Sequence, residues 1–313
     1  MSRPGFLVER PGVMTLIQDA GRIGYHRLGL TTGGPADPLA FDWANRLCGN
    51  TPGASALEIT VGGLVLRCEV ATRMALCGAD MPVSINGKLV DSWCSHRVVP
   101  GDRIEVGFAR SGVRAYLAVS GGFDIPHTLG SAATVVRESL GGLYGSKLAA
   151  GDELPCGEGS DVPLLKVPKG YRPVYGRRAL LRVMAGYQHD AFPVAERQRF
   201  FAGEYRVSTQ CDRMGYRLEG PPIHFELPQM LSEGICLGAI QVPPDGQPIV
   251  LMCDRQTIGG YPKLGSVLSV DLVQLAQLPP GSKVAFTAIS TEEARQIRIA
   301  ATRQFQQLEP ELC

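Results

Sequence analysis

The sequence predicts a mainly β protein with about two domains and a few short helices. Its 313 residues exceed the usual size of a single domain. Thirty-eight glycines, 23 prolines and frequent alternation of Val, Thr and Ile indicate many short strands joined by turns. Between residues 56 and 119, the strand patterns follow one another so closely that a β-barrel or a β-sandwich is expected.

Charge and hydropathy exclude several classes of function. Lys and Arg number 31 against 30 Asp and Glu, so neither nucleic acid nor an anionic membrane surface is an expected partner. The N-terminus has no apolar signal-peptide region, and no apolar run reaches membrane-spanning length. We therefore expect a cytoplasmic protein that acts on a small-molecule substrate and does not bind a membrane.

The nine cysteines indicate free thiols rather than disulfides or a zinc site. Their number is odd, and no CxxC pair occurs. The five histidines are scattered and HExxH is absent, so no metal is expected. A reducing compartment favours thiols that are mostly buried. Cys211, beside the arginines described below, is the only candidate for a further role.

A short strand near residue 6 leads into a glycine-rich loop with three polar side chains. Gln18, Asp19 and Arg22 lie in the stretch TLIQDAGRIGY, between apolar anchors. Loops that carry polar groups between anchored ends often contribute to binding sites. The alternative is that Asp19 pairs with Arg22 and fixes the loop.

A helix is predicted next, over residues 39–47. Asp37 is a suitable N-cap, Pro38 suits the first helical position, and Gly49 suits the left-handed position after the helix end. The loop Gly33-Gly34-Pro35 just before this helix would bring free N–H groups near the helix start. This arrangement is typical either of an anion site or of a simple turn.

Further local signals predict a hairpin and two more helices. Asn86-Gly87 is typical of a two-residue hairpin turn. A short helix is expected over residues 194–201, after Pro193. The run from Ser290 to Glu293 is a capping box, which predicts a helix that continues to about residue 308.

The domain boundary is predicted from composition. Residues 157–178 are rich in Gly, Pro, Lys and Arg. We therefore expect an N-terminal domain over residues 1–165 and a C-terminal domain over residues 166–313.

The chemistry is concentrated between residues 205 and 262. In the stretch DRMGYRL, a strand would place Arg213 and Arg217 on one face, about 13 Å apart at the usual rise per residue. Met214, Tyr216 and Leu218 would then lie on the opposite face, which suits a core. Gly215, between the arginines, would let a ligand or another chain approach the backbone.

A hairpin with polar strand ends follows. Residues 235–242 and 248–253 are apolar runs joined through Pro-Pro-Asp-Gly, a sequence typical of a tight turn. Gln241 and Gln247 lie near the turn, and Asp254 and Gln256 lie at the far end. Because buried polar groups need partners, these side chains favour a lined pocket. The alternative is that they bond the neighbouring backbone.

Several catalytic motifs are absent. No GxSxG, GxGxxG or P-loop occurs, and residues 141–147 resemble a P-loop only in composition. If a nucleotide takes part in the reaction, unfamiliar loops or a partner protein would hold it. The chain itself offers arginines, carboxylates and amides, which orient and polarise a substrate.

Seven ordered motifs resemble one protein family. They are VMTLIQDAGRIGY, GGPADPLAFDWANRLCGN, ALEITVGG, AYLAVSGGFD, DRMGYRLEGP, GAIQVPPDGQPIVLMCDRQTIGGYP and DLVQLAQLPPG. They resemble the biotin-dependent carboxyltransferase / allophanate hydrolase subunit 2 family, which includes the C subunit of 5-oxoprolinase and the KipI antagonist KipA. The resemblance covers residues 12 to 306. It implies two tandem cyclophilin-like β-barrels and an active site formed together with a KipI-like protein, the B subunit of 5-oxoprolinase.

The resemblance also implies a function. Bacterial members of this length resemble 5-oxoprolinase subunits, whose complex of an A, a B and a C subunit uses ATP to open 5-oxo-L-proline to L-glutamate. The alternatives are carboxyl transfer from carboxybiotin in a urea-carboxylase-like system, and regulatory binding of a KipI-like kinase inhibitor. The 5-oxoprolinase interpretation expects ATP to be bound by the complex, and the carboxyl-transfer interpretation requires biotin on a separate subunit.

Eleven residues within the matching motifs are expected to form the site. Arg213 or Arg217 would bind a carboxylate or a phosphorylated intermediate, and Asp254 would act as a general base or orient the attacking group. We expect these groups to converge at one mouth of the second barrel. The expected substrate-binding residues are Gln18, Asp19, Arg22, Tyr216, Gln241, Gln247, Gln256 and Tyr261.

Overall fold

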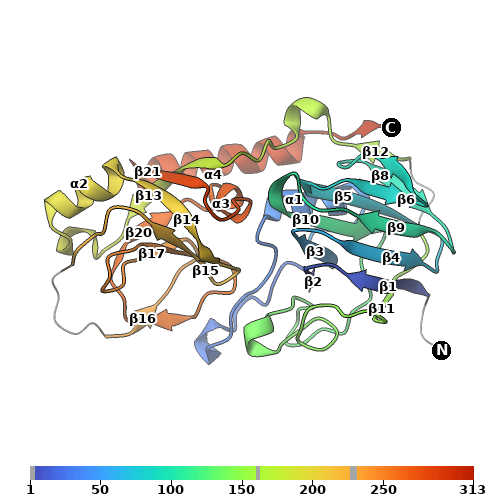
Figure 1. Ribbon diagram of the computed structural model, residues 1–313, viewed down its shortest axis with the longest axis horizontal. Coiled ribbons are helices and arrows are strands. Elements are labelled where there is room, and N and C mark those ends of the chain that lie inside the picture. Colours follow the sequence, from blue (N-terminus) through green and yellow to red (C-terminus); the bar gives the residue numbers. More distant parts are fainter. Residues whose placement is uncertain (1–3, 160–162, 226–230) are drawn as a thin grey trace. The chain divides into compact units, whose positions relative to one another are not determined.

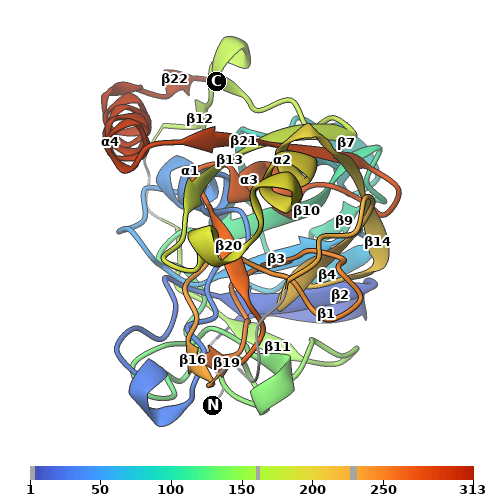
Figure 2. The ribbon, with the colours of Figure 1, turned by 90° about the vertical axis from the view of Figure 1, so that its left-hand side faces the viewer.

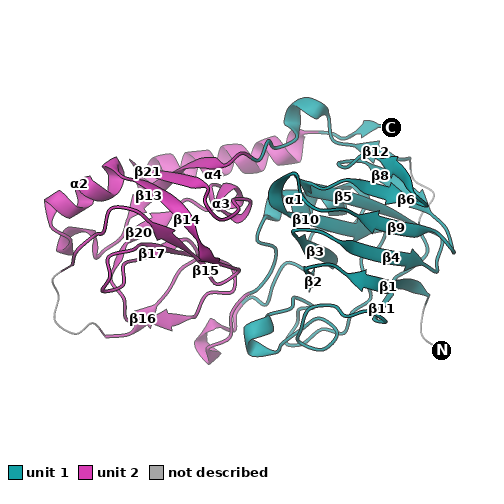
Figure 3. Ribbon diagram, viewed as in Figure 1, with its two compact units in different colours: residues 1–23, 33–175, 309–313 teal, residues 24–32, 176–308 magenta. Residues whose placement is uncertain are grey.

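The computed structural model describes residues 4–159, 163–225 and 231–313 (Figure 1). The chain forms two compact units: unit 1 comprises residues 1–23, 33–175 and 309–313, and unit 2 comprises residues 24–32 and 176–308 (Figure 3). After the excursion at residues 24–32, the chain passes from unit 1 to unit 2 between Tyr175 and Gly176. The domain limits at residues 165 and 166 stay a prediction.

Unit 1 consists of two antiparallel sheets. The six-stranded sheet has the order β11 (Glu153–Pro155), β1 (Gly5–Pro11), β4 (Leu64–Cys68), β9 (Arg103–Val106), β6 (Val83–Ile85) and β7 (Lys88–Val90). The five-stranded sheet has the order β2 (Met14–Gln18), β3 (Ala56–Thr60), β10 (Ser111–Val119), β5 (Thr72–Asp80) and β8 (Ser95–Val98). Buried side chains from both sheets, such as Leu66 and Leu117, form one hydrophobic cluster. Burial between the sheets therefore stabilises this unit.

Local sequence signals account for the turns and the helix of unit 1. Asn86 and Gly87 have φ of 52° and 76°, the left-handed values that a two-residue turn between β6 and β7 requires. Helix α1 (Pro38–Leu47) begins after Asp37, whose carboxylate accepts a hydrogen bond from the backbone N–H of Ala40 at 3.0 Å. The helix packs against β5 and β10 of the five-stranded sheet (Figure 1). Both predictions are confirmed.

Unit 2 contains a closed seven-stranded barrel, as predicted for the C-terminal domain. Its strand order is β13 (Arg178–Ala185), β20 (Lys263–Val267), β17 (Ala239–Gln241), β18 (Ile249–Leu251), β15 (Gly215–Glu219), β14 (Glu204–Cys211) and β21 (Lys283–Ile289), which returns to β13. The pair of β13 and β21 is parallel and the other pairs are antiparallel. The barrel has no open edge, because its first and last strands pair.

Aromatic side chains fill one part of the barrel. Helix α2 (Val194–Ala202) places Phe200 on Phe286 of β21, with ring centroids 4.4 Å apart and nearly parallel planes. Tyr205 meets the same ring edge-on at 5.7 Å. Stacked and edge-on pairs are favourable beyond the apolar area they bury. Helix α2 thus has a packing role in the core of unit 2.

The C-terminal helix α4 (Thr291–Gln307) confirms the predicted capping box. The hydroxyl of Ser290 accepts from the backbone N–H of Glu293, and the Glu293 carboxylate accepts from the backbone N–H of Ser290. Smaller elements complete the structure. They are α3 (Leu272–Ala276), the 3-10 helices η1 (His26–Leu28), η2 (Val136–Glu138), η3 (Lys169–Tyr171) and η4 (His189–Ala191), and the strand pairs β12 (Leu165–Lys166) with β22 (Glu311–Leu312) and β16 (Glu233–Gly234) with β19 (Ile258–Gly259). No helix in the described part of the chain is both long and apolar enough to cross a membrane.

Candidate functional site

Arg213 and Asp254 form a buried, bidentate ion pair in unit 2. Their Nε–Oδ2 and Nη2–Oδ1 distances are both 2.9 Å, and each side chain is only 7% exposed. The backbone N–H of Asp254 also donates to the carbonyl of Arg213 at 2.7 Å. A fork of this kind is among the strongest charge-assisted contacts in proteins. The structure thus brings these two predicted residues together, and Arg213 fixes the orientation of the Asp254 carboxylate.

The predicted strand through Arg213 and Arg217 is wrong at its start. The carboxylate of Asp212 accepts hydrogen bonds from the N–H groups of Met214 and Gly215, at 2.7 and 3.2 Å, and this bends the chain before β15 begins. Arg213 is therefore buried next to Asp254. Arg217 does lie on β15, where its guanidinium pairs with a partly exposed aspartate, Asp245, in the hairpin turn.

Of the three residues predicted for the core face, Tyr216 and Leu218 lie on β15 as predicted, whereas Met214 precedes the strand and is only partly buried. Tyr216 and Leu218 are fully buried, and the Tyr216 hydroxyl donates to the backbone carbonyl of Ala276 at 3.3 Å. A buried hydroxyl with such a partner stabilises the core. Of the remaining predicted residues, Gln247 bonds both backbone groups of Gly220, at 2.9 and 3.2 Å, and Tyr261 is 46% exposed.

Two predicted glutamines meet beside a glycine. The Nε2 of Gln256 donates to Oε1 of Gln241 at 3.4 Å. A Cβ built on Gly259 would lie 3.0 Å from Gln241 Nε2, 3.6 Å from Gln256 Nε2 and 2.7 Å from the side chain of Ile235. Gly259 therefore leaves room that the amide groups occupy. Gln241 is 1% exposed, and its Nε2 has no hydrogen-bond partner within residues 4–159, 163–225 and 231–313.

Sequence reasoning missed a lysine and a glutamate at this place. Lys263 on β20 lies directly opposite Gln241 on β17, so both side chains lie on one face. Its ammonium group forms an ion pair with Glu233, and its side chain is only 9% exposed. Gln188 supports both residues: its Nε2 donates to Glu233 at 2.5 Å, and its Oε1 accepts from the backbone N–H of Lys263 at 2.6 Å.

These residues form a group that we call the Lys263 cluster. Strands β16 and β19 pair with each other (Figure 2). Glu233 lies opposite Gly259 in that pair, next to the glycine that the two glutamines contact. No motif signals the cluster, since its members become neighbours only when β17 pairs with β20 and β16 with β19. Its members are Gln188, Glu233, Gln241, Gln256 and Lys263.

Arg255 adds a second buried cation near this cluster. Its Nε donates to the carbonyl of Ile235 at 3.2 Å and its Nη1 to the carbonyl of Met252 at 3.4 Å. The residue is 7% exposed, and burial lowers the pKa of its guanidinium from the ordinary value. Among the described residues, no carboxylate forms an ion pair with Arg255. This end of the barrel is therefore rich in hydrogen-bond donors.

The three predicted residues of the N-terminal loop lie in unit 1 and hold one segment of its backbone. Gln18 donates to the carbonyl of Thr134 at 2.9 Å, and the Asp19 carboxylate accepts from the backbone N–H of Ala132 at 2.6 Å. Arg22 donates to the carbonyls of Thr128, Ser131 and Ala133. Asp19 and Arg22 therefore bind residues 128–134 rather than each other. This arrangement supports the structural alternative, a fixed loop, although the partner is the segment and not the expected Asp–Arg pair.

The start of helix α1 is occupied by protein groups. The backbone N–H of Ala36 donates to the Glu58 carboxylate at 3.0 Å, and that of Asp37 donates to the hydroxyl of Tyr116 at 2.8 Å. The hydroxyl in turn donates to Glu58 at 2.7 Å. Burial, followed by the charge of Glu58, raises the pKa of Tyr116 well above its usual value. Of the two alternatives for residues 33–35, the structure favours the turn.

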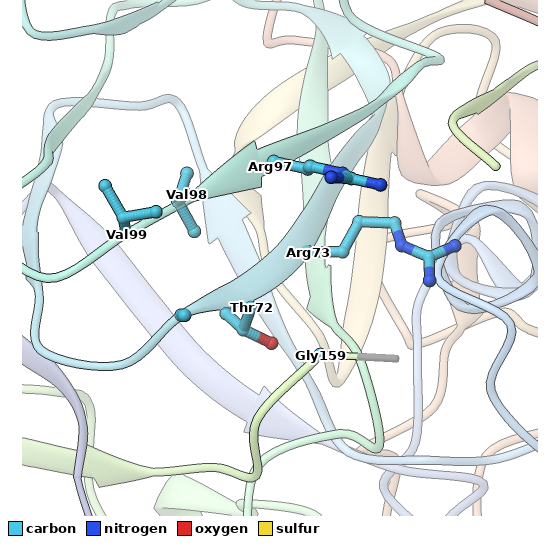
Figure 4. A pocket seen from close by; sticks show the side chains of 7 residues that line it. Thr72, Arg73, Arg97, Val98, Val99 and Gly159 are labelled. Carbon is cyan, nitrogen blue, oxygen red and sulfur yellow. The ribbon is translucent and has the colours of Figure 1, made fainter. Parts of the chain in front are cut away.

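A separate cavity of about 190 Å³ lies in unit 1 (Figure 4). Its lining includes Thr72, Arg73 and Arg97, and the two arginines are opposite one another on β5 and β8. None of the predicted site residues lines it. The nine cysteines are free and mostly buried, as predicted, and Cys211 is half-buried. No group of three or more His, Cys, Asp or Glu in the described residues is arranged to hold a metal ion.

Comparisons with known proteins agree over nearly the whole chain. Residues 28–288 match the family described as carboxyltransferase domain, subdomain A and B. The chain is 37% identical to the 5-oxoprolinase C subunit of Escherichia coli (strain K12) over 304 residues, which cover 96% of each chain. It is 36% identical to the 5-oxoprolinase C subunit of Haemophilus influenzae over 90% of each chain.

A solved structure gives the same result. The chain superimposes on Kluyveromyces lactis urea carboxylase with a TM-score of 0.91 and 29% identity. The superposition includes 99% of this chain but only 29% of that longer protein. The two-sheet unit and the closed barrel are thus the architecture of a carboxyltransferase domain. The chain belongs to the carboxyltransferase domain family, subdomain A and B.

Proposed function

We propose that this chain is the C subunit of an ATP-dependent 5-oxoprolinase, which opens the lactam of 5-oxo-L-proline to L-glutamate. The observation that carries the proposal is the collinear match to the 5-oxoprolinase C subunit from Escherichia coli, which spans 96% of both chains. Neither chain has a large segment that the other lacks. Activity is proposed to require partners that correspond to the A and B subunits of that enzyme, in a cytoplasmic complex.

The nucleotide is proposed to lie outside this chain's glycine-rich segment at residues 141–147. A P-loop needs a helix directly after its lysine, because the helix N-terminus binds phosphate. Here Lys147 donates to the carbonyl of Val13 at 3.5 Å, and the next regular element is the short strand β11. The segment therefore does not fit a nucleotide phosphate.

The Lys263 cluster is the best-supported place for the chemistry of this chain. Opening a lactam, like transferring a carboxyl group, builds negative charge on an oxygen bound to an amide or carboxyl carbon. Buried donors that face such an oxygen stabilise the transition state. Gln241 Nε2 and the ammonium of Lys263 are buried donors on one face of the barrel. The Gln241 amide nitrogen has no hydrogen-bond partner among the described residues, and the Lys263 ammonium pairs with Glu233. Glu233, through its ion pair, holds the Lys263 ammonium in place.

Asp254 is proposed to orient an attacking group from beside this cluster. Its neighbours along the chain, Arg255 and Gln256, bring a second cation and one of the cluster amides. The bidentate contact with Arg213 fixes its carboxylate. Arg213 is then a positioning residue, since the two donors that the pair uses are directed at Asp254.

Reconstitution tests the proposal. The chain would be coexpressed with the subunits encoded beside it, and glutamate release from 5-oxoproline would be measured with and without ATP. We expect ATP-dependent release from the complex and none from the chain alone. Lys263→Met should reduce kcat by about 10²–10³-fold, the usual effect of losing one such donor. Lys88→Met, at an exposed position on β7, is the matched control and should leave the rate unchanged. An intact complex without ATP-dependent release contradicts the proposed reaction.

Carboxyl transfer is the second candidate, because the structural match to urea carboxylase reaches a TM-score of 0.91. This chain would then supply only the carboxyl-transfer step, and carboxybiotin would arrive on a separate subunit. Genes for a biotin carboxylase beside this one would favour that function. Carboxylation of urea by the reconstituted subunits, without glutamate release from 5-oxoproline, would establish it.

A further inference from the structure

Arg255 is a buried cation to which the proposed reaction has so far given no role. The residue is only 7% exposed, so its guanidinium is largely removed from water. Its Nε and Nη1 donate to the backbone carbonyls of Ile235 and Met252, whereas Nη2 makes no hydrogen bond to a described residue. Carbonyl groups satisfy donors but carry no net charge. Because buried charges are ordinarily paired, this guanidinium suits an anion that the chain itself does not supply.

The nearby carboxylates are already engaged with other cations. Asp254, the preceding residue, accepts from two donors of Arg213, both at 2.9 Å. Glu233 forms an ion pair with Lys263. Neither carboxylate, within the described part of the chain, forms an ion pair with Arg255. The counter-charge for Arg255 must therefore come from a bound molecule.

Arg255 is attached to the same short strand as the Lys263 cluster. Strand β16, which pairs with β19, carries Glu233 and its ion pair with Lys263 (Figure 2). Two residues further along the chain, the carbonyl of Ile235 accepts from Arg255 at 3.2 Å. Two residues of a strand span about 7 Å. The two cations are thus held from points on one strand that lie about that far apart.

Ile235 also links Arg255 to the unpartnered amide of Gln241. Its side chain lies 2.7 Å from the position of a Cβ built on Gly259, and that position is 3.0 Å from Gln241 Nε2. The Gln241 nitrogen is buried and has no hydrogen-bond partner in the described structure. One residue therefore contacts the cation through its carbonyl and packs beside the amide through its side chain.

The strand pair is open between the two attachment points. Gly234 separates Glu233 from Ile235, and a Cβ built on it would meet no heavy atom of the described residues within 4 Å. Ile258, opposite Gly234 on β19, is 62% exposed. A small molecule can therefore approach the backbone here without displacing a side chain.

Building on the proposed opening of 5-oxoproline, we propose that Arg255 binds the carboxylate of that substrate. Nη2 donates to a carboxylate oxygen, and the donors of Gln241 and Lys263 face the lactam oxygen. Only the ring nitrogen and one carbon separate the two carbonyl carbons of 5-oxoproline, so their oxygens lie about 5 Å apart at standard bond lengths. This distance is close to the spacing of the attachment points on β16.

The contact determines which amides the site accepts. A charge-assisted bond to the carboxylate strengthens binding of a cyclic amide that carries an acid beside its nitrogen. A neutral lactam, or urea, has no group for the guanidinium and leaves its charge buried without a partner. The carboxylate takes no part in bond breaking, so Arg255 controls KM more than kcat.

Steady-state kinetics of the reconstituted complex tests the proposal. Arg255→Gln should raise KM for 5-oxoproline about 10–100-fold and leave kcat nearly unchanged. Arg255→Lys keeps the charge but not the planar fork and should give a smaller rise. Pyrrolidinone, which lacks the carboxylate, should inhibit the wild type and both variants equally. Arg177→Gln is the matched control, because Arg177 is exposed and also donates to a backbone carbonyl; its KM should not change.

A measurement on the wild type avoids folding effects of the variants. The carboxamide of 5-oxoproline, which is neutral, should bind at least about 10-fold more weakly than 5-oxoproline. Equal binding of acid and carboxamide overturns the contact, as does an unchanged KM in Arg255→Gln. An equal rise in KM and in the inhibition constant of pyrrolidinone also overturns it, since that pattern indicates a general structural effect. These outcomes leave the proposed reaction intact, whereas an intact wild-type complex without ATP-dependent glutamate release contradicts the reaction and this contact together.

Discussion

Removing one partner of the buried Arg213–Asp254 pair should destabilise unit 2 strongly. In Asp254→Leu, the guanidinium of Arg213 loses two hydrogen bonds of 2.9 Å at a place where its side chain is 7% exposed. Uncompensated buried charges of this kind cost about 3–5 kcal/mol. That is a large share of a typical folding free energy of about 5–15 kcal/mol. Arg213→Met should cost a similar amount, because it leaves the carboxylate unpaired.

A variant with both Arg213 and Asp254 replaced separates their effect on stability from their effect on the reaction. Replacing both partners with apolar side chains is often close to neutral, so Arg213→Met with Asp254→Leu should recover most of the loss. The coupling energy from this cycle should reach about 3 kcal/mol. The exposed pair of Arg217 and Asp245 is the matched control, and its cycle should give about 0–1 kcal/mol.

Urea unfolding followed by circular dichroism measures these free energies. The slope against urea must stay the same in all four proteins for the cycle to be valid. Losses below about 1 kcal/mol in both single variants of the buried pair would refute the reasoning from burial. If the stable double variant also kept full turnover in the reconstituted complex, Asp254 would have no role in the reaction.

Three further predictions concern other parts of the chain. Burial, followed by the charge of Asp37, raises the pKa of Asp42 to about 6, so protonation of Asp42 favours the folded state as pH falls from about 6 to 4. Asp42→Asn should therefore add about 1–3 kcal/mol at pH 7, and unfolding curves at pH 3 should show no gain. Ser290→Ala removes the N-cap of α4 and should cost about 1 kcal/mol, measured by urea unfolding; an unchanged midpoint contradicts the capping role. Arg217→Lys should lower turnover if Arg217 binds a substrate carboxylate with two hydrogen bonds, and near-normal turnover would remove it from the chemistry.

Features set by a few adjacent residues were predictable from the sequence. The cap of α1 follows from Asp37-Pro38, the β6–β7 turn from Asn86-Gly87, and the start of α4 from Ser290. In each case the backbone preference and the hydrogen bond lie within four residues. The bend before β15 also has a local cause, the Asp212 side chain, but the alternating pattern of the following strand concealed it.

The candidate site was predictable only in part. Asp254, Gln241 and Gln256 stand out because polar side chains end apolar strands. Lys263 and Glu233 do not, since a charged residue after a turn is ordinarily solvated. Only the pairing of β17 with β20, and of β16 with β19, brings them to the amides. Such pairings depend on contacts far apart in sequence, which no local pattern encodes.

The interleaved course of the chain constrains how this protein can be divided. Unit 2 takes residues 24–32 from within the first unit's sequence, and unit 1 recovers residues 309–313 after α4. A fragment that stopped at Tyr175 would leave β12 as an unpaired edge, open to association with other chains. A truncation or chimera that divides the chain into two halves would therefore remove residues from both units. Expression and engineering of either unit therefore require residues from both halves of the chain.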